Sequence, residues 1–292
     1  MLEKHKVLES IVAEKQENKV RLSDFVLGRF VSLVSNKSTK KAVKNGLVWV
    51  NGQRGYSGDY IAGGEHIELM QGEEKKNVPQ LNLEIEVCYE DEYLAVVNKP
   101  AGLLVSGNKH RTLENALSSN LLLSQETDAL QRPEPIHRLD YPTSGALLIG
   151  KTKQAVLALN KVFEERSITK KYVAITVGKQ EESGMVELDV DGKNAKSSYR
   201  LLNAVTSERF GFLNLVELTL FTGRRHQLRI HMQSIGNPIL GDAEYGKEGQ
   251  VLQGKGLYLH SHSLEFTHPF TNKTLKVEVN PPKKFNKLFS AD

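Results

Sequence analysis

Hydrophobic and polar positions alternate along much of the second part of the chain, which is the pattern of half-buried β-strands. The alternation predicts strands at 83–87, 93–97, 171–177, 197–205, 212–221, 257–266 and 274–279, and the apolar run 146–149 predicts another. A period of 3.6 residues predicts a helix over 154–166. Shorter helices are expected around 113–117 and after Gly223. Strands dominate, with a few helices between hairpins, so the pattern predicts an α+β fold with a mixed sheet.

The first 72 residues carry a different set of short elements. Residues 1–18 are rich in charge and are expected to form a helical extension. Ser23 is a candidate N-cap for one helix, and Ser38 for a second helix that stops at Gly46. The segment 47–69 then predicts a small sheet with a hairpin at Asn51-Gly52.

These patterns predict two domains. Residues 19–72 are expected to form a small αα-plus-β-hairpin domain. A polar linker at 73–83 would join it to a larger domain at 84–283, and 284–292 would be a tail.

The composition excludes several classes of protein. A single cysteine, Cys88, rules out a disulfide framework and a cysteine-based zinc site. No stretch approaches the ~20 apolar residues of a membrane span, and the charged N-terminus lacks the continuous apolar segment of a signal peptide. We therefore expect a soluble cytoplasmic protein without a membrane partner, and a monomer by default.

Positive charge is concentrated in two windows of a chain whose net charge is only +4. The window between Asp24 and Asp59 holds no acid, and the window between Glu217 and Asp242 holds none either. Their cations are Arg29, Lys37, Lys40, Lys41, Lys44 and Arg54 in the first, and Arg224, Arg225 and Arg229 in the second. Two such windows suggest two contacts with one long anion, although a solvated surface can also carry one sign of charge.

The segment 137–145, HRLDYPTSG, is the strongest candidate for chemistry. It sets Asp140 two residues from Arg138 in a turn before an apolar strand. A nearby cation favours the charged form of a carboxylate, and a turn at a strand end presents it rigidly, as a carboxylate nucleophile requires. The alternative is a surface loop with an ordinary ion pair.

Two other patterns are rejected. Residues 145–152, GALLIGKT, match the phosphate-binding pattern GxxxxGK[ST], but the Ala-Leu-Leu-Ile positions would bury as a strand and no apolar strand precedes them. We expect Lys151 to end that strand at the surface. His226 and His231, with three later histidines, lack the spacing of a metal site, so no metal is expected.

Four segments together resemble the RluA-type family of pseudouridine synthases. They are HRLDYPTSGALLIGKT at 137–152, KKYVAITVG at 170–178, TGRRHQLRIHMQSIGNPILGDAEYG at 222–246 and LHSHSLEFTHPFTNK at 259–273. Residues 19–70 resemble an S-four RNA-binding domain through RLSDFVLGRF, KKAVKNGLVWVNG and AGGEHIEL. The family resemblance implies a curved, largely antiparallel mixed sheet with helices outside it and a cleft across its middle.

The resemblance also implies a reaction on structured RNA, ribosomal or transfer, in which a uridine becomes pseudouridine without a metal or nucleotide cofactor. Asp140 matches the family's aspartate nucleophile, which attacks either the ribose or the uracil ring. Tyr172 matches the tyrosine against the target uracil and a group that can help move a proton. Arg229 matches the arginine that pairs with the nucleophile.

Further residues are implied to bind RNA. Arg138 matches a residue that can fill the gap left by the flipped base, and Arg225 stands where the family usually has a small hydroxyl residue. The substrate-binding candidates are His137, Arg138, Thr143, Arg224, Arg225 and His226, and the candidates of the small domain are Arg29, Lys37, Lys40, Lys41 and Lys44. The alternatives are a catalytically silent RNA-binding or ribosome-assembly factor on the same fold, and a nucleotide hydrolase that would depend on Lys151.

Overall fold

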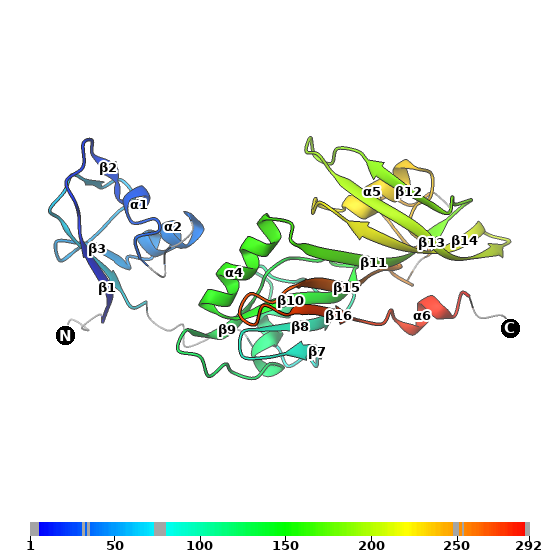
Figure 1. The fold of residues 1–292 in the computed structure, drawn as a ribbon, viewed down its shortest axis with the longest axis horizontal. Helices are drawn as coiled ribbons and strands as arrows, with labels where there is room; N and C mark the ends of the chain where they lie inside the picture. The colour runs from blue at the N-terminus through cyan, green and yellow to red at the C-terminus, as the bar shows by residue number, and fades with distance from the viewer. Residues whose placement is uncertain are drawn as a thin grey trace. The chain divides into compact units, whose positions relative to one another are not determined.

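The computed structural model describes residues 6–30, 33, 36–72, 80–247, 251–252 and 254–289. The chain divides into two compact units, Met1–Asn77 and Val78–Asp292 (Figure 1). The predicted linker at 73–83 falls largely on residues 73–79, which lie outside the described residues.

The first unit is a small sheet with two helices. Its four-stranded sheet has the order β1 (Val7–Val12), β6 (His66–Met70), β3 (Val48–Val50), β4 (Gln53–Arg54), and a separate pair joins β2 (Val20–Arg21) to β5 (Tyr60–Ile61). The helices are α1 (Leu22–Phe25) and α2 (Asn36–Lys44). Phe25, Phe30, Val43 and Ile67 belong to one buried apolar cluster that these elements share.

Two predictions for this unit are wrong. The expected helical extension at 1–18 contains the strand β1, which pairs antiparallel with β6. The sheet edge offers the backbone of β1 hydrogen bonds, and Ile11 packs against the buried cluster of this unit. The helix expected from Ser23 spans only four residues and begins after Arg21. Gly28, at φ 72, is left-handed and ends the helical path.

The second unit is built on one ten-stranded sheet. Its main path runs β12-β13-β14-β11-β15-β10-β8-β7, with β16 beside β15 and β9 beside β10. The strands are β7 (Glu86–Glu90), β8 (Leu94–Lys99), β9 (Ala129–Pro135), β10 (Ser144–Thr152), β11 (Ile168–Val177), β12 (Ser183–Glu187), β13 (Lys196–Ser207), β14 (Gly211–Leu220), β15 (Leu259–Thr267) and β16 (Thr274–Glu278).

Most neighbouring strands of this sheet are antiparallel, and β10 with β15 is a parallel pair. The helices are α3 (Leu113–Ala116), a 3-10 turn η1 (Leu117–Ser119), α4 (Lys153–Glu164), α5 (Gln227–Ser234) and α6 (Lys283–Asn286). The predicted mixed, largely antiparallel sheet with outer helices is confirmed. β9 and β12 were not predicted.

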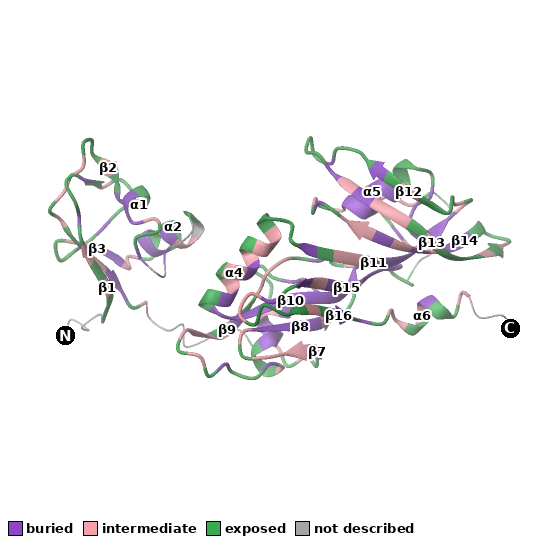
Figure 2. Cartoon of the chain, in the orientation of Figure 1, coloured by how far each residue is buried: buried purple, intermediate pink, exposed green. Residues whose placement is uncertain are grey.

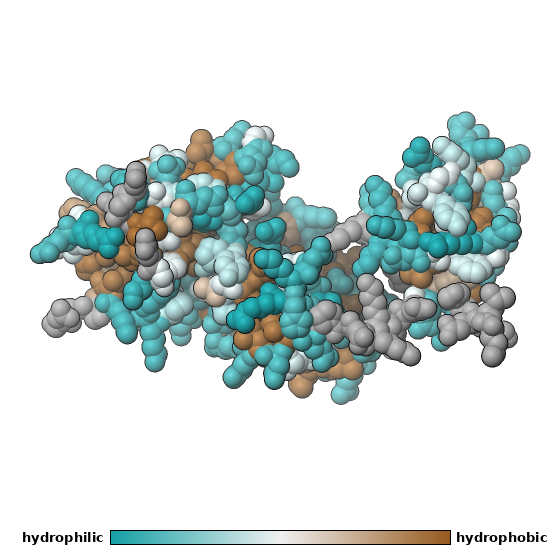
Figure 3. Space-filling view, turned by 180° about the vertical axis from the view of Figure 1, so that it is seen from behind, coloured by the Kyte–Doolittle hydropathy of each residue, from teal (hydrophilic) through white to brown (hydrophobic). Residues whose placement is uncertain are grey.

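The central strands of the sheet are largely buried, as Figure 2 shows for β10. Alternate residues of β10 enter different clusters: Leu147 and Ile149 pack with Leu113 and Leu228, whereas Ala146 and Leu148 pack with Leu159 of α4. On the outer surface seen in Figure 3, hydrophilic side chains predominate and hydrophobic ones form separate patches.

Lys151 does not end β10 at the surface, contrary to the prediction. It is buried, and its Nζ donates to Glu90 Oε1 at 2.7 Å and to the Asp91 carbonyl at 2.5 Å. The segment 145–152 lies within the fully buried strand β10, so it has no exposed loop that could hold a phosphate.

Candidate active site

The loop between β9 and β10 carries Asp140. The Thr143 amide donates to the Asp140 carbonyl at 3.1 Å and closes a turn. Gly145 then adopts φ 113, where a Cβ atom would lie 2.2 Å from the Ser261 carbonyl oxygen of β15. This close approach requires glycine and fixes the end of the loop against the neighbouring strand.

A buried lysine, Lys99, stabilises the same loop through hydrogen bonds. Lys99 Nζ donates to the carbonyls of Pro100 at 2.9 Å, Leu103 at 2.8 Å and Tyr141 at 3.5 Å. Burial lowers the pKa of Lys99 to about 8, although Asp140 acts in the opposite direction. Sequence reasoning missed Lys99, because nothing in its neighbours signals a buried ammonium group.

The Asp140 carboxylate meets two side chains contributed by the region of α5. Arg229 Nη1 lies 3.9 Å from Asp140 Oδ2, and His226 Nε2 lies 3.7 Å from Asp140 Oδ1. Asp140 is 89 residues before Arg229 in the chain, and the structure brings the two side chains to one site.

Arg229 makes its shortest contacts with a different carboxylate. Its Nε and Nη2 each donate to Asp242 at 2.7 Å, and Nη2 also lies 3.3 Å from Glu244 Oε2. The expected pairing of Arg229 with Asp140 is present at 3.9 Å, and Asp242, which sequence reasoning missed, is a second and closer partner. Spacing alone could not reveal this, since Asp242 and Glu244 follow α5 in a loop.

Asp242 is buried and is held by backbone hydrogen bonds as well as by Arg229. Its Oδ1 also accepts from the backbone amides of Glu244 and Tyr245, both at 3.0 Å. Burial alone would raise the pKa of Asp242, but the hydrogen bonds from Arg229 and from these amides hold it below its ordinary value. The result is an ionised carboxylate that fixes the Arg229 guanidinium.

His226 links Asp140 to this acidic loop. It occupies the position before α5 with φ 55, and its Nδ1 lies 3.0 Å from the Tyr245 hydroxyl and 3.4 Å from Glu244 Oε2. Its other ring nitrogen, Nε2, therefore faces Asp140, and the contacts of Nδ1 hold the ring in place.

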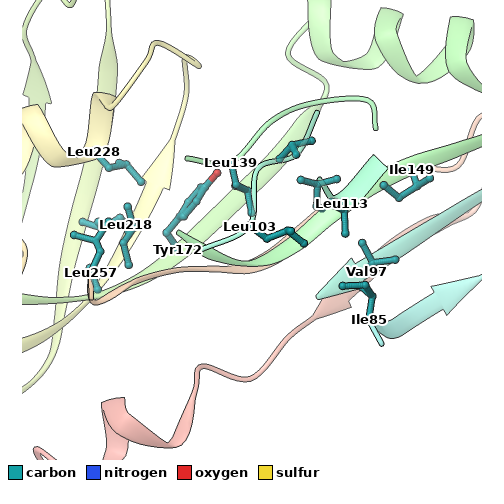
Figure 4. Close-up of a cluster of buried hydrophobic side chains, with 14 of the residues drawn as sticks. Ile85, Val97, Leu103, Leu113, Leu139, Ile149, Tyr172, Leu218, Leu228 and Leu257 are labelled. Atoms are coloured by element: carbon teal, nitrogen blue, oxygen red, sulfur yellow. The ribbon is translucent and has the colours of Figure 1, made fainter. Parts of the chain in front are cut away.

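A cavity of about 160 Å3 opens between Asp140 and Tyr172. It has room for one small ring, since a cavity of roughly 150 Å3 in a protein core can bind benzene. Arg138, Thr143, Arg224, Arg225, His226 and Arg229 also line it. Figure 4 shows Tyr172 with Leu218 on one side and Leu139 on the other.

Tyr172 is buried at the floor of this cavity. Burial raises the pKa of its phenol, a hydrogen bond with the Ser261 side chain lowers it, and Asp140 raises it, with a result of about 12. Tyr172 therefore presents a neutral phenol beside an acid at neutral pH.

A second cavity of about 630 Å3 adjoins the first. Arg138, Asp140, Arg225, His226 and Arg229 line both. The larger cavity also includes Tyr141, which is 55% exposed. The two cavities together can hold more than a single ring.

The remaining candidates occupy different environments. Thr143 Oγ1 is buried and has no hydrogen-bond partner among the described residues, so it is available to a bound molecule. Arg225 is exposed at the rim, and Arg224 Nε donates to the Asn194 carbonyl at 3.2 Å.

His137 is the candidate that the structure places elsewhere. It lines neither cavity. Its Nε2 accepts from the Leu148 amide at 3.1 Å, its ring stacks on Phe163, and burial lowers its pKa to about 3. The expectation that His137 binds substrate is therefore corrected to a role in holding the loop, because its acceptor nitrogen is already used by the backbone.

In the first unit, Lys40, Lys41 and Lys44 are exposed on α2, whose opposite side buries Ala42 and Val43. Arg29 turns back on its own segment, with its guanidinium 4.1 Å from the centre of the Phe25 ring. The side chain of Lys37 lies outside the described residues.

The described residues contain no group of three or more His, Cys, Asp or Glu side chains arranged to hold a metal ion. Among the helices that the structure describes, none is long and apolar enough to cross a membrane.

Comparisons with known proteins give consistent matches. A family model described as RNA pseudouridylate synthase matches residues 93–234. Ribosomal large subunit pseudouridine synthase D of Xanthomonas campestris pv. campestris is 30% identical, with 93% of this chain and 88% of that protein covered. An uncharacterized RNA pseudouridine synthase of Aquifex aeolicus is 32% identical, with 97% of each chain covered.

Two solved structures share the fold. Human RNA Pseudouridylate Synthase Domain Containing 4 matches with a TM-score of 0.56 and 25% identity, covering 69% of this chain and 90% of that one. Human RNA Pseudouridylate Synthase Domain Containing 1 matches with a TM-score of 0.58 and 24% identity, covering 68% of this chain and 84% of that one.

Proposed function

Because this chain belongs to the RNA pseudouridylate synthase family, we propose that it converts specific uridines of a structured RNA to pseudouridine, with Asp140 as the nucleophile. Such an enzyme is an isomerase. The N1–C1′ glycosidic bond breaks, the base rotates, and a C5–C1′ bond forms. The hydrogen on C5 leaves as a proton, and N1 gains one, so atoms and charge balance.

The position of Asp140 carries this proposal. Its carboxylate stands at the wall of a ring-sized cavity that also contains Tyr172, and it is 3.9 Å from a fixed guanidinium. A carboxylate oxygen can act as the nucleophile, and the nearby guanidinium can orient it toward a ring in the cavity. Attack on the ribose C1′ and attack on the uracil ring are both compatible with this cavity.

Tyr172 supplies the surface for the target uracil. A base stacked on an aromatic ring gains ~1–3 kcal/mol, and the phenol keeps its proton at neutral pH because its pKa is about 12. Tyr172 and Asp140 line the same cavity, so the phenol can relay a proton between groups bound there.

The cations at the rim hold the surrounding RNA. A uridine inside a folded RNA must leave its stack to reach Asp140, at a cost of a few kcal/mol. Arg138 is exposed beside both cavities, where it can take the vacated place of the base, and Arg224 and Arg225 can contact phosphates.

The first unit is proposed to be an S-four-type RNA-binding domain. Its support is the set of exposed lysines on α2, Lys40, Lys41 and Lys44. Several relatives are named as pseudouridine synthases of the ribosomal large subunit, so the RNA of the large subunit is the proposed substrate, and transfer RNA is the alternative. A cytoplasmic location follows from either substrate.

Release of the C5 hydrogen tests the proposal. Large-subunit ribosomal RNA labelled with tritium at uridine C5 should release tritium with the wild-type protein. Asp140→Asn should release none while binding the RNA with similar affinity. If the wild-type protein binds the RNA but releases no tritium, it is a catalytically silent RNA-binding factor. If Asp140→Asn releases tritium, Asp140 is not the nucleophile.

A further inference from the structure

A groove outside the described site shares one lining residue with the ring-sized cavity. It has a volume of about 320 Å3 and lies between the end of α4 and the adjoining parts of β11 and β14. Its lining residues are Arg166, Ile168, Thr169, Lys170, Thr219, Leu220 and Phe221. Leu220 also lines the cavity that contains Asp140 and Tyr172, so the groove and the candidate active site share this residue.

Two cations of the groove lack an acidic partner. Within the described part of the chain, neither Arg166 nor Lys170 forms an ion pair with a carboxylate, and no Asp or Glu lines the groove. The neighbouring Glu165 pairs with Lys161 at 3.7 Å. The groove therefore carries positive charge without a carboxylate partner, and the Lys170 ammonium lies 5.4 Å from the centre of the Phe163 ring.

The same two cations repel each other. Burial lowers the pKa of Lys170, and the charge of Arg166 lowers it further. The next residue in the chain, Lys171, shows the contrast, because its Nζ lies 3.4 Å from Glu217. An anion between Arg166 and Lys170 would relieve their repulsion.

The groove also offers an aromatic surface. Phe221 is 41% exposed, although its backbone is fixed by a hydrogen bond from its amide to the Lys196 carbonyl at 3.2 Å. Exposed aromatic rings beside cations are the combination that binds single-stranded nucleic acid, because the ring stacks a base while the cations contact phosphate.

We propose that this groove binds a nucleotide adjacent in the RNA strand to the target uridine, with its phosphate between Arg166 and Lys170 and its base against Phe221. The proposal rests on the proposed function, which places the target uridine in the neighbouring cavity. A strand entering through the groove would be held on one side of the flipped nucleotide, so the groove would contribute to affinity and to the choice of sequence next to the uridine.

Substitutions in the full-length protein test this site. Phe221→Ala removes the stacking surface, and Arg166→Asn removes a charge while keeping a residue that accepts φ 56. Matched controls are Phe212→Ala, a 40% exposed phenylalanine at the other end of β14, and Lys153→Gln, an exposed lysine at the start of α4. Thermal unfolding establishes that each variant is folded.

The first readout is binding to a fluorescein-labelled oligouridylate of about nine nucleotides, a length within the usual single-strand site size. Phe221→Ala should raise Kd by roughly 5-fold to 150-fold, the loss of one stacked base. Arg166→Asn should reduce the slope of log Kd against log salt by about 0.7, the loss of one phosphate contact. The controls should change neither quantity.

The second readout uses an oligouridylate with an abasic site on either side of the central uridine. One of the two abasic probes should bind the wild-type protein more weakly than the intact probe does. The Phe221→Ala variant should bind that abasic probe and the intact probe equally well. If Phe221→Ala and Arg166→Asn behave like their controls, the groove is not a nucleotide site. The two proposals can fail separately. If the variants change binding as expected but the wild-type protein releases no tritium, the isomerase assignment is overturned and the groove remains an RNA site.

Discussion

The guanidinium of Arg229 is fixed by Asp242, which accepts hydrogen bonds of 2.7 Å from both its Nε and its Nη2. This leaves Nη1 as the part of the guanidinium nearest to Asp140, at 3.9 Å. A bidentate pair gives geometric precision as well as attraction. The buried acid therefore sets where positive charge meets the proposed nucleophile.

Replacing Asp242 by asparagine should impair both folding and turnover. The change leaves a buried guanidinium without its main counter-charge, which typically costs about 3–5 kcal/mol. We expect a lower midpoint of urea unfolding and a kcat for tritium release at least ~10-fold lower, since displacement of a positioned group often costs more. Glu244→Gln is the matched control, because the Glu244 side chain is half exposed and should matter less. Wild-type turnover in Asp242→Asn would show that Asp242 does not position Arg229.

Tyr172→Phe separates stacking from proton transfer. The phenylalanine ring keeps the stacking surface, so Kd for RNA should stay within about 2-fold, whereas kcat should fall by about 100-fold or more if the hydroxyl carries a proton. Tyr172→Leu should in addition weaken binding. Unchanged kcat in Tyr172→Phe would limit Tyr172 to stacking.

The pH dependence of the wild-type enzyme gives a related check. With a pKa of about 12, the Tyr172 phenol is neutral at every pH below that value. Its ionisation should therefore produce no change in kcat between pH 7 and about pH 9.5. A change in kcat over that range which disappears in Tyr172→Phe would contradict the raised pKa.

His260 should make stability sensitive to acid. Its Nδ1 lies 2.9 Å from Ser144 Oγ, at the end of the Asp140 loop, and its Nε2 lies 3.1 Å from the Val279 carbonyl. Burial lowers its pKa from 6.5 to about 4, although the Val279 carbonyl opposes the shift. The unfolded chain therefore takes up a proton below about pH 6.5 that the folded chain refuses, and stability falls as pH decreases from 6.5 to about 4.

The measurement is the free energy of unfolding by urea at pH 7.5, 5.5 and 4.5, compared between wild type and His260→Gln. The wild-type protein should lose more stability than the variant across this range, by about 2–3 kcal/mol at the acid end. Carboxylates titrate in both proteins and cancel in the difference. Parallel curves would mean that His260 titrates normally.

The sequence predicted the parts of the site that follow from local order. Asp140 in its turn, Tyr172 on its strand and Arg229 on its helix are each marked by a motif, and the structure brings all three to one cavity. Most strands of the larger unit also follow from alternation, since each has one face toward a core.

The errors arise where partners are distant in the chain. Lys99 and Lys151 are buried cations whose ligands are backbone carbonyls and, for Lys151, Glu90. Local composition places a lysine at the surface, so only the tertiary structure reveals such a site. The strand β1 is another example, because its sequence VLESIV, set between charged segments, becomes a strand through pairing with β6, more than 50 residues later.

The lysines of α2 provide a test of the first unit. Lys40, Lys41 and Lys44 are exposed, and the described part of the helix buries its other side. If they contact phosphates, replacing all three by glutamine should weaken RNA binding and reduce the slope of log Kd against log salt by about 2–3, with 0.7–0.9 per lost contact. The value of kcat at saturating RNA should not change, because these residues hold flanking RNA and take no part in the chemical step.

A matched triple variant, Lys6→Gln, Lys15→Gln and Lys19→Gln, removes the same charge from other exposed positions of the first unit. An equal effect of the two triple variants would reduce the role of α2 to net charge, whereas a larger effect at Lys40, Lys41 and Lys44 assigns the contact to that helix. A long-range attraction depends on net charge and weakens with salt for both variants alike. Direct phosphate contacts also release counterions one by one, so the salt slope distinguishes an RNA-binding surface from a basic patch.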